Sequence, residues 1–259
     1  MGGEFPGGPV KGFLLDITGV LYNSNSSNAG SGPGQVIPGS VEAVKRLYAE
    51  SKVRFVSNES TSTPAKLREK LQRLGFDIQL EHLFCGGRLC IKDDFASCDT
   101  ADPNCVVVGD AENEFSYANM NAAFRVLLHS KEPLLISLGC GRFYQRVDGP
   151  VLDLGGFAKA LVFASGAKHV IVGKPEESYF QHAIDDLGLQ RSEVVMIGDD
   201  IVSDVGGAKQ HGIRGIQVRT GKWRCEWEDH HVKPDLIADD LLSAVSTILD
   251  GQRRQNGAN

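Results

Sequence analysis

The first strand-like run of the sequence ends in a carboxylate. Asp16 directly follows the apolar residues 12–15, and Gly19 comes three residues later. An aspartate on a tight turn after a buried strand is exposed at the edge of a parallel sheet, where it can attack phosphorus and form an aspartyl phosphate. Taken alone, Asp16 is better explained as a turn or capping aspartate, so the catalytic interpretation depends on what accompanies it.

Three further segments carry polar side chains at the ends of predicted strands. They are Ser57 and Asn58 after residues 53–56, Lys174 after 170–172, and Asp199, Asp200 and Asp204 after 194–197. Phosphoryl transfer needs a nucleophile, a cation against the transferring oxygens, a hydroxyl or amide donor, and acidic ligands for Mg²⁺. Each of these groups is common by itself, whereas all four, each at the end of a predicted strand, form a specific pattern. The sequence therefore predicts a phosphoryl-transfer site at one edge of a sheet.

The elements that must position these residues alternate along the chain. Helices are predicted at 41–48, 64–74, 175–187 and 203–211, with a further strand at 215–218. The second helix is predicted to have Thr63 as its N-cap and Pro64 at its first position. Short, continuously apolar strands separated by helices indicate a doubly wound parallel sheet covered on both faces. The active site of such a sheet lies at the carboxyl ends of its strands.

The middle of the chain has a different pattern. Residues 79–166 contain the strand-like run 106–108, a helix near 117–128, a strand at 134–138 and a helix near 156–165. We expect an α/β core formed by residues 1–78 and 167–259, with an α+β unit inserted at 79–166.

Composition excludes several functional classes. Among 259 residues, 41% are apolar, which is enough for a sizeable core and rules out disorder across the chain. The net charge of −6 argues against nucleic acid and acidic membrane surfaces as partners. No apolar run approaches the roughly 18 residues of a membrane span. Six cysteines without a CxxC pair favour reduced thiols in a cytoplasmic protein, with a disulfide framework as the alternative and a nuclear pool left open.

Four short motifs resemble those of one family. They are DITGV at 16–20, VSN at 56–58, GKP at 173–175 and GDDIVSD at 198–204. Together they resemble the haloacid-dehalogenase-like hydrolases, whose first aspartate forms a phospho-intermediate beside Mg²⁺. The resemblance implies a Rossmann-like hydrolase core with the larger inserted cap of the family. Longer stretches at 114–128, 134–146, 194–208 and 217–224 resemble family members that hydrolyse inorganic pyrophosphate, phospholysine and phosphohistidine.

The resemblance assigns a role to each motif residue. Asp16 would be the nucleophile and a Mg²⁺ ligand, with Asp199 and the backbone carbonyl of Thr18 as further ligands. Lys174 would neutralise the phospho-intermediate. The residues that would bind the substrate are Asp16, Ile17, Thr18, Ser57, Asn58 and Lys174.

Two aspartates around this site have alternatives. Asp200 is either a helix cap or a residue that supports the metal ligands. Asp204 orients Lys174 or a metal-bound water, or has no such role.

Two departures from the family pattern bear on activity. Most phosphatases of the family carry a second aspartate where this chain has Thr18, and a hydroxyl cannot deliver a proton near pH 7 as a carboxylic acid can. The chain also looks shortened near 79–104, and residues 85–98 do not resemble the family.

The resemblance implies a Mg²⁺-dependent phosphatase, acting on pyrophosphate and on phosphoramidates as small molecules or on proteins, and a homodimer. One alternative is a weak or inactive regulatory protein on the same scaffold. Another is a phosphatase for a different phosphorylated metabolite.

Overall fold

A computed structural model of the chain describes residues 5–25, 32–60, 62–85 and 101–257. Its largest element is a six-stranded sheet in which every neighbouring pair is parallel. In spatial order the strands are β13 (Leu236–Ala238), β12 (Arg214–Val218), β11 (Val194–Gly198), β1 (Gly12–Leu15), β4 (Lys52–Ser57) and β5 (Leu83–Cys85). The predicted parallel-sheet α/β fold is therefore confirmed.

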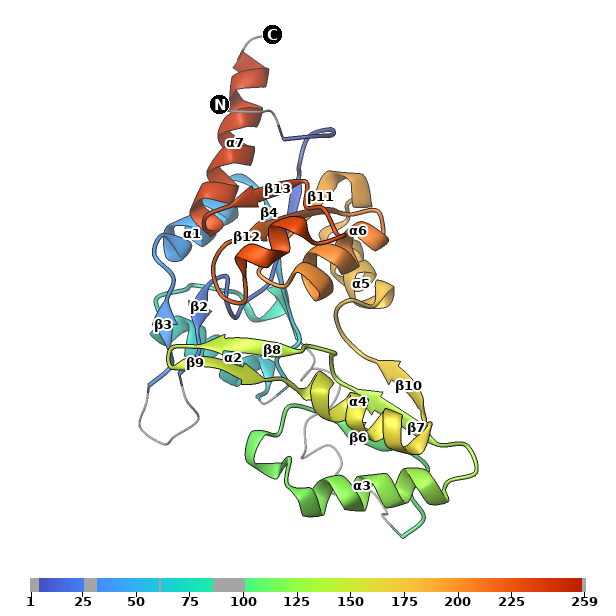
Figure 1. Cartoon of the computed structure of the whole chain (residues 1–259). Coiled ribbons are helices and arrows are strands. Elements are labelled where there is room, and N and C mark those ends of the chain that lie inside the picture. Colours follow the sequence, from blue (N-terminus) through green and yellow to red (C-terminus); the bar gives the residue numbers. More distant parts are fainter. Residues whose placement is uncertain (1–4, 26–31, 61, 86–100, 258–259) are drawn as a thin grey trace.

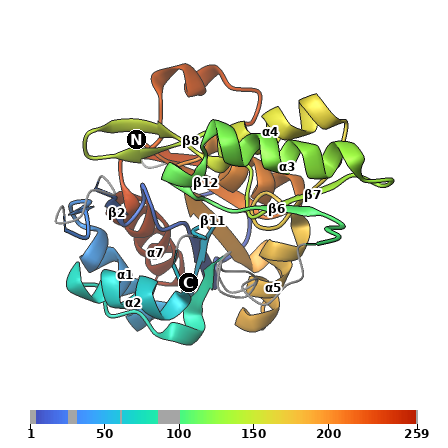
Figure 2. The ribbon, with the colours of Figure 1, turned by 90° about the horizontal axis from the view of Figure 1, so that it is seen from below.

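Helices cover both faces of this sheet (Figures 1 and 2). One face packs against α1 (Ser40–Glu50), α2 (Pro64–Arg73) and α7 (Leu241–Gly257), and the other against α5 (Glu177–Leu187) and α6 (Gly207–Gln210). The position of β1 between two layers of helices explains why its residues are continuously apolar. Phe13 and Leu15 belong to the first cluster and Leu14 to the second, because successive side chains of a strand point to opposite faces.

The predicted start of the second helix is confirmed. The Thr63 side chain accepts a hydrogen bond from the backbone N–H of Lys66 at 3.3 Å, and Pro64 occupies the first helical position. Gly75 follows the helix with φ of +94°, a conformation that favours glycine.

A second, three-stranded parallel sheet lies below the first in Figure 1. Its order is β10 (Lys168–Ile171), β7 (Leu134–Ser137) and β6 (Val106–Val108), and it packs with α3 (Tyr117–His129) and α4 (Leu154–Ser165). An antiparallel hairpin of β8 (Phe143–Arg146) and β9 (Gly149–Leu152) extends from this unit, and a short pair of β2 (Tyr22–Asn23) and β3 (Gln35–Val36) extends from the larger one.

Shorter helical turns complete the described elements. They are the 3₁₀ turns η1 (Leu80–His82), η4 (Glu112–Glu114), η5 (Arg191–Glu193) and η7 (Cys225–Asp229), and the π-helix η6 (Ile201–Gly206). The helix expected at 203–211 is thus η6 followed by α6.

One strand was assigned to the wrong sheet. The apolar residues 170–172 were expected to form a strand of the larger sheet, but β10 pairs with β7 in the smaller one. Val170 is 37% exposed, so this is a half-covered edge strand, and three apolar residues in a row do not reveal which sheet they join. Strand β5, by contrast, lies in the range expected for the inserted unit and joins the larger sheet. The division into core and cap stays a prediction.

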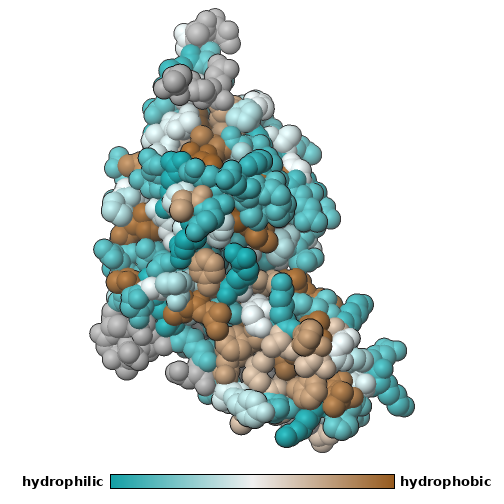
Figure 3. Space-filling model, viewed as in Figure 1, coloured by the Kyte–Doolittle hydropathy of each residue, from teal (hydrophilic) through white to brown (hydrophobic). Residues whose placement is uncertain are grey.

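The surface in Figure 3 is mostly hydrophilic over the larger unit and more apolar over α4. Phe163 of α4 is 93% exposed. Within the described parts of the chain, no helix is both long and apolar enough to cross a membrane. Cys105, Cys140 and Cys225 are free thiols, whereas Cys90, Cys98 and most of the atypical segment 85–98 lie outside the described residues.

Candidate active site

Asp16 lies at the end of β1 and is 7% exposed. Its backbone N–H donates to the carbonyl of Ile197 on the adjacent strand β11 at 3.0 Å, which continues the sheet ladder to the edge of the site. The chain then turns through Gly19, which has φ of +92°. A Cβ atom at Gly19 would lie 1.9 Å from a carboxylate oxygen of Asp199, so only glycine permits this close approach.

Lys174 is buried between two carboxylates. Its Nζ lies 2.5 Å from Asp16 Oδ1 and 2.7 Å from Asp204 Oδ1, and only 3% of its side chain is exposed. Although burial opposes it, the charges of Asp16 and Asp204 raise the pKa of Lys174 above its ordinary value. The amine is therefore held as a cation beside the Asp16 carboxylate.

Asn58 holds the backbone of Lys174. Its Oδ1 accepts from the Lys174 N–H at 2.8 Å, and its Nδ2 donates to the Lys174 carbonyl at 2.9 Å. Lys174 follows a strand of the smaller sheet, so this paired contact is what fixes the lysine against the larger one. The expected contact between Asn58 and phosphoryl oxygens stays a prediction.

Three carboxylates come together beneath the lysine. Asp16, Asp199 and Asp204 each offer an oxygen within 4.8 Å of the other two. Burial raises the pKa of Asp199 well above its ordinary value, and the charge of Asp16 adds to the rise. Burial likewise raises the pKa of Asp204 to about 6, although Lys174 opposes the rise. A divalent cation would offset this repulsion between buried like charges.

One carboxylate oxygen of Asp199 is buried without a hydrogen-bond partner among the described residues. This atom is Oδ1, whereas Oδ2 accepts from the backbone N–H of Lys222 at 2.7 Å. Buried polar atoms are nearly always partnered. Carboxylate oxygens are the ligands that Mg²⁺ prefers, so the residues present fit a hard cation.

Asp200 caps the π-helix η6. Its Oδ1 accepts from the N–H groups of Val202 at 2.9 Å and Ser203 at 3.1 Å. Its Oδ2 pairs with Lys222 Nζ at 3.0 Å. The charge of Lys222 and the backbone donors outweigh burial and lower the pKa of Asp200 to about 2. The helix-cap interpretation is confirmed, and an ion pair accompanies it.

Lys222 is the residue that the sequence analysis missed. It lies in the loop after β12, lines the pocket, and contacts Asp199 through its backbone and Asp200 through its side chain. Although burial opposes it, the carboxylates of Asp200 and Asp199 raise its pKa. Its position in the sequence could have indicated this role, because Lys222 is a cationic residue that follows the predicted strand 215–218.

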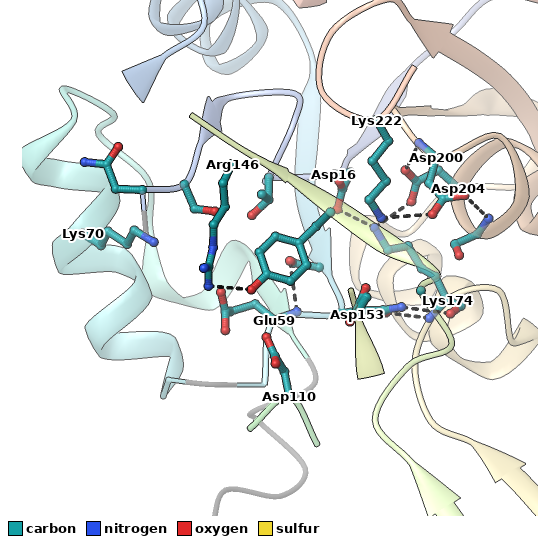
Figure 4. A pocket seen from close by; sticks show the side chains of 18 of the residues that line it. Asp16, Glu59, Lys70, Asp110, Arg146, Asp153, Lys174, Asp200, Asp204 and Lys222 are labelled. Atoms are coloured by element: carbon teal, nitrogen blue, oxygen red, sulfur yellow. Dashed lines mark hydrogen bonds and ion pairs between the residues drawn. The ribbon is translucent and has the colours of Figure 1, made fainter. Parts of the chain in front are cut away.

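The pocket is a cavity of about 400 Å³ between the two units. The predicted residues that line it are Asp16, Thr18, Ser57, Asn58, Lys174, Asp200 and Asp204. The smaller unit contributes Asp110, Glu112, Gly141, Tyr144, Arg146 and Asp153. Figure 4 shows Asp16 between the Asp200–Lys222 pair on one side and Asp110 with Arg146 on the other. The side chain of Ile17 lies in the hydrophobic core, so any substrate contact falls to its backbone.

The β8–β9 hairpin contributes two residues to the wall of this cavity and is held on both sides. The N–H of Val147 donates to the carbonyl of Ser24 at 3.1 Å. On the other side Arg224 donates to Gln145 Oε1 at 3.0 Å and lies 5.1 Å from the Phe143 ring. These contacts place Tyr144 and Arg146 in the pocket.

Comparison with known proteins shows which family the sequence matches. A family model described as haloacid dehalogenase-like hydrolase matches residues 13–121, and a HAD-hydrolase-like model matches 171–244. The chain is 45% identical to phospholysine phosphohistidine inorganic pyrophosphate phosphatase of Danio rerio and of Homo sapiens, covering 93% of this chain and 94% of each relative. It is 38% identical to haloacid dehalogenase-like hydrolase domain-containing protein 2 of Bos taurus, with 93% and 96% covered.

Solved structures agree with the fold. The 4-nitrophenylphosphatase of Thermotoga maritima superposes with a TM-score of 0.75 at 22% identity, covering 92% of this chain and 97% of that one. The p-nitrophenyl phosphatase of Archaeoglobus fulgidus gives 0.72 at 26% identity, with 92% and 99% covered.

Proposed function

Because the chain belongs to the haloacid dehalogenase-like hydrolases, we propose that it is a Mg²⁺-dependent phosphatase that works through an aspartyl phosphate on Asp16. Relatives at 45% identity are named for phospholysine, phosphohistidine and inorganic pyrophosphate. We infer that this chain cleaves the same P–N and P–O–P bonds.

A single observation carries the proposal. Asp16, Asp199 and Asp204 each offer an oxygen within 4.8 Å of the other two, and the buried Lys174 pairs with Asp16 and Asp204, although residues 16, 174 and 199–204 are far apart in the sequence. Burying like charges is costly without a compensating cation. A protein that had lost catalysis would have no physical need to retain them.

The chain's own residues divide the reaction between them. A carboxylate oxygen of Asp16 attacks phosphorus while the bond to the leaving group breaks and its electron pair leaves with that group. Lys174 balances the charge on the nucleophile and on the transferring oxygens. Water then cleaves the aspartyl phosphate, which releases phosphate and restores Asp16.

Asp16, Asp199 and the carbonyl of Thr18 would hold the Mg²⁺ ion, which would stabilise the charge that develops on the phosphoryl group. Asp204, through its contact with Lys174, orients the ammonium.

Thr18 supports the choice of substrates. It cannot act as a general acid near pH 7, and the loss of such a group costs about 10²–10⁴-fold. The loss matters most for an alkoxide leaving group. It matters less for a nitrogen that carries its own proton, or for a phosphate held by a cation.

The two units divide the work in this proposal. We place the core at 1–85 and 172–259, because β5 belongs to the larger sheet and β10 to the smaller one, and we take the segment between as the cap. A cytoplasmic location and a homodimer stay predictions, as do the absence of nucleic-acid and membrane partners.

The decisive experiment measures phosphate release from pyrophosphate, Nε-phospholysine, a phosphohistidine peptide and a phosphomonoester panel, with and without Mg²⁺. Asp16→Asn should lower every activity by more than about 10³-fold in a folded protein, because the nucleophile is lost. Asp77→Asn, at an exposed position outside the pocket, is the matched control. Unchanged release by Asp16→Asn would defeat the assignment. An inert wild type would favour the regulatory alternative, and activity on phosphomonoesters alone would favour the metabolite phosphatase.

A further inference from the structure

Asp110 is presented to the active-site cavity by the smaller unit. It lies in the loop after β6 and lines the same 400 Å³ cavity as Asp16 and Lys174. In Figure 4 it lies on the opposite side of Asp16 from the Asp200–Lys222 pair. Asp16 from the larger unit and Asp110 from the smaller one therefore line the same cavity, so a substrate bound there is exposed to both.

The loop that carries Asp110 is fixed to the larger unit. The N–H of Asp110 donates to Ser60 Oγ at 3.0 Å, across 50 positions of sequence. Its own carboxylate receives only a long backbone contact of 3.5 Å from the N–H of Glu112. Within the described chain, no lysine, arginine or histidine forms an ion pair with Asp110. The backbone is thus anchored while the carboxylate remains available to a ligand.

The charges around Asp110 are mainly negative. Burial raises its pKa to about 7, and the charges of Asp153 and Glu59 add to the rise. Arg146, which lines the same cavity, is paired with Glu112, so its charge is already balanced. Lys70, the other cation on this side, lies over the ring of Tyr22 at 4.7 Å. This part of the cavity therefore attracts positive charge and repels an anion.

We propose that Asp110 is a specificity-determining residue that contacts the leaving group and favours one that carries a protonated nitrogen. The inference rests on the proposed function and names the preferred class within it: phosphoramidates over pyrophosphate.

The chemistry of the two substrate classes explains the preference. A phosphoramidate nitrogen must bear a proton before it departs, since the P–N bond then breaks with its electron pair on a neutral amine. A carboxylate beside that nitrogen stabilises the protonated form. The group that leaves pyrophosphate is a phosphate anion, which the same carboxylate repels.

The test compares kcat/KM for Nε-phospholysine and for pyrophosphate at pH 8, where the Asp110 carboxyl is ionised, with Mg²⁺ present, in wild type and Asp110→Asn. We expect Asp110→Asn to lower the value for phospholysine by about 10- to 100-fold and to change that for pyrophosphate by less than about threefold, because only the protonated nitrogen loses a charged partner. Asp110→Glu, which keeps the charge, should recover part of the preference. Asp148→Asn, an exposed carboxylate in the β8–β9 turn, should change neither value.

The pyrophosphate activity of each variant also reports that the variant is folded. An equal fall for both substrates, or no change in their ratio, would overturn the role of Asp110. A wild type that cleaves pyrophosphate but not phospholysine would overturn it too, while the phosphatase proposal would stand. A wild type inert toward both, or one that Asp16→Asn does not impair, would instead defeat the proposed function.

Discussion

Lys174 Nζ lies 2.5 Å from Asp16 Oδ1, although 158 positions of sequence separate the two residues. The lysine follows a strand of the smaller sheet and the aspartate a strand of the larger one. The contact therefore joins the two units at the proposed nucleophile, and the charge of Asp16 depends on the packing between them.

Lys174→Met should destabilise the metal-free protein. The substitution leaves Asp16 and Asp204 buried without their cation, which costs about 3–5 kcal/mol. The measurement is urea unfolding in the presence of a chelator, with the exposed Lys168→Met as the control. A loss of stability no greater than that of the control would show that the buried pair does not hold the site together.

Thr18→Asp should widen activity toward phosphomonoesters. An added carboxyl group can protonate an alkoxide leaving group, a step worth about 10²–10⁴-fold. The measurement is the ratio of phosphomonoester to phosphoramidate hydrolysis, with Thr18→Asn as a control of the same shape that cannot act as an acid. If the ratio stays equal or falls in Thr18→Asp, the argument about leaving groups is wrong.

Mg²⁺ should raise the midpoint of thermal unfolding, and Asp199→Asn should weaken this effect. The Oδ1 atom of Asp199 is buried and has no hydrogen-bond partner among the described residues, so it is the oxygen best placed to bind a cation. We expect the apparent Mg²⁺ affinity to fall by at least about tenfold. Differential scanning fluorimetry over a Mg²⁺ titration measures it, with Asp229→Asn as an exposed control. An identical Mg²⁺ response in both variants would place the ion elsewhere.

Asp110 should make the stability of the metal-free protein depend on pH. Burial, with the charges of Asp153 and Glu59, raises its pKa to about 7, so the folded protein binds this proton more tightly than the unfolded chain does. Its contribution to stability is therefore full below about pH 4 and is lost as the pH rises to about 7.

Asp110→Asn removes this dependence. Above pH 7 the variant should be more stable than wild type, by at most about 4 kcal/mol, and below pH 4 the advantage should disappear. Denaturant unfolding at pH 4, 6 and 8 measures the difference. A difference that stays constant over this range would mean that Asp110 titrates normally.

The sequence predicts the core of the site because its residues follow strands whose apolar runs are unmistakable. Asp16 and Asp199 each come directly after a buried strand, and a parallel sheet brings such positions together whatever their distance in sequence. The sequence places Lys174 at the correct site, but the strand before it belongs to the smaller sheet and not to the larger one. The place of Lys174 depends on two hydrogen bonds to Asn58, which no strand pattern encodes.

The far wall of the cavity could not be predicted in this way. Asp110 and Arg146 belong to a loop and a hairpin, where side-chain direction is set by tertiary contacts such as that of Asp110 with Ser60. Charged residues in such segments are usually solvated, so their types alone do not indicate a role. Lys222, by contrast, follows a predicted strand, so the same pattern that predicts Asp199 also indicates Lys222.

The β8–β9 hairpin, joined to Ser24 on one side and to Arg224 on the other, limits how a large substrate can approach. We expect a free metabolite or a single projecting side chain to enter the cavity of about 400 Å³ more readily than the flat surface of a folded protein. We therefore expect a phosphorylated protein to be cleaved where its modified residue lies on a tail or an exposed loop. Selectivity among proteins would then depend less on the sequence around the phosphate than on how far that residue protrudes.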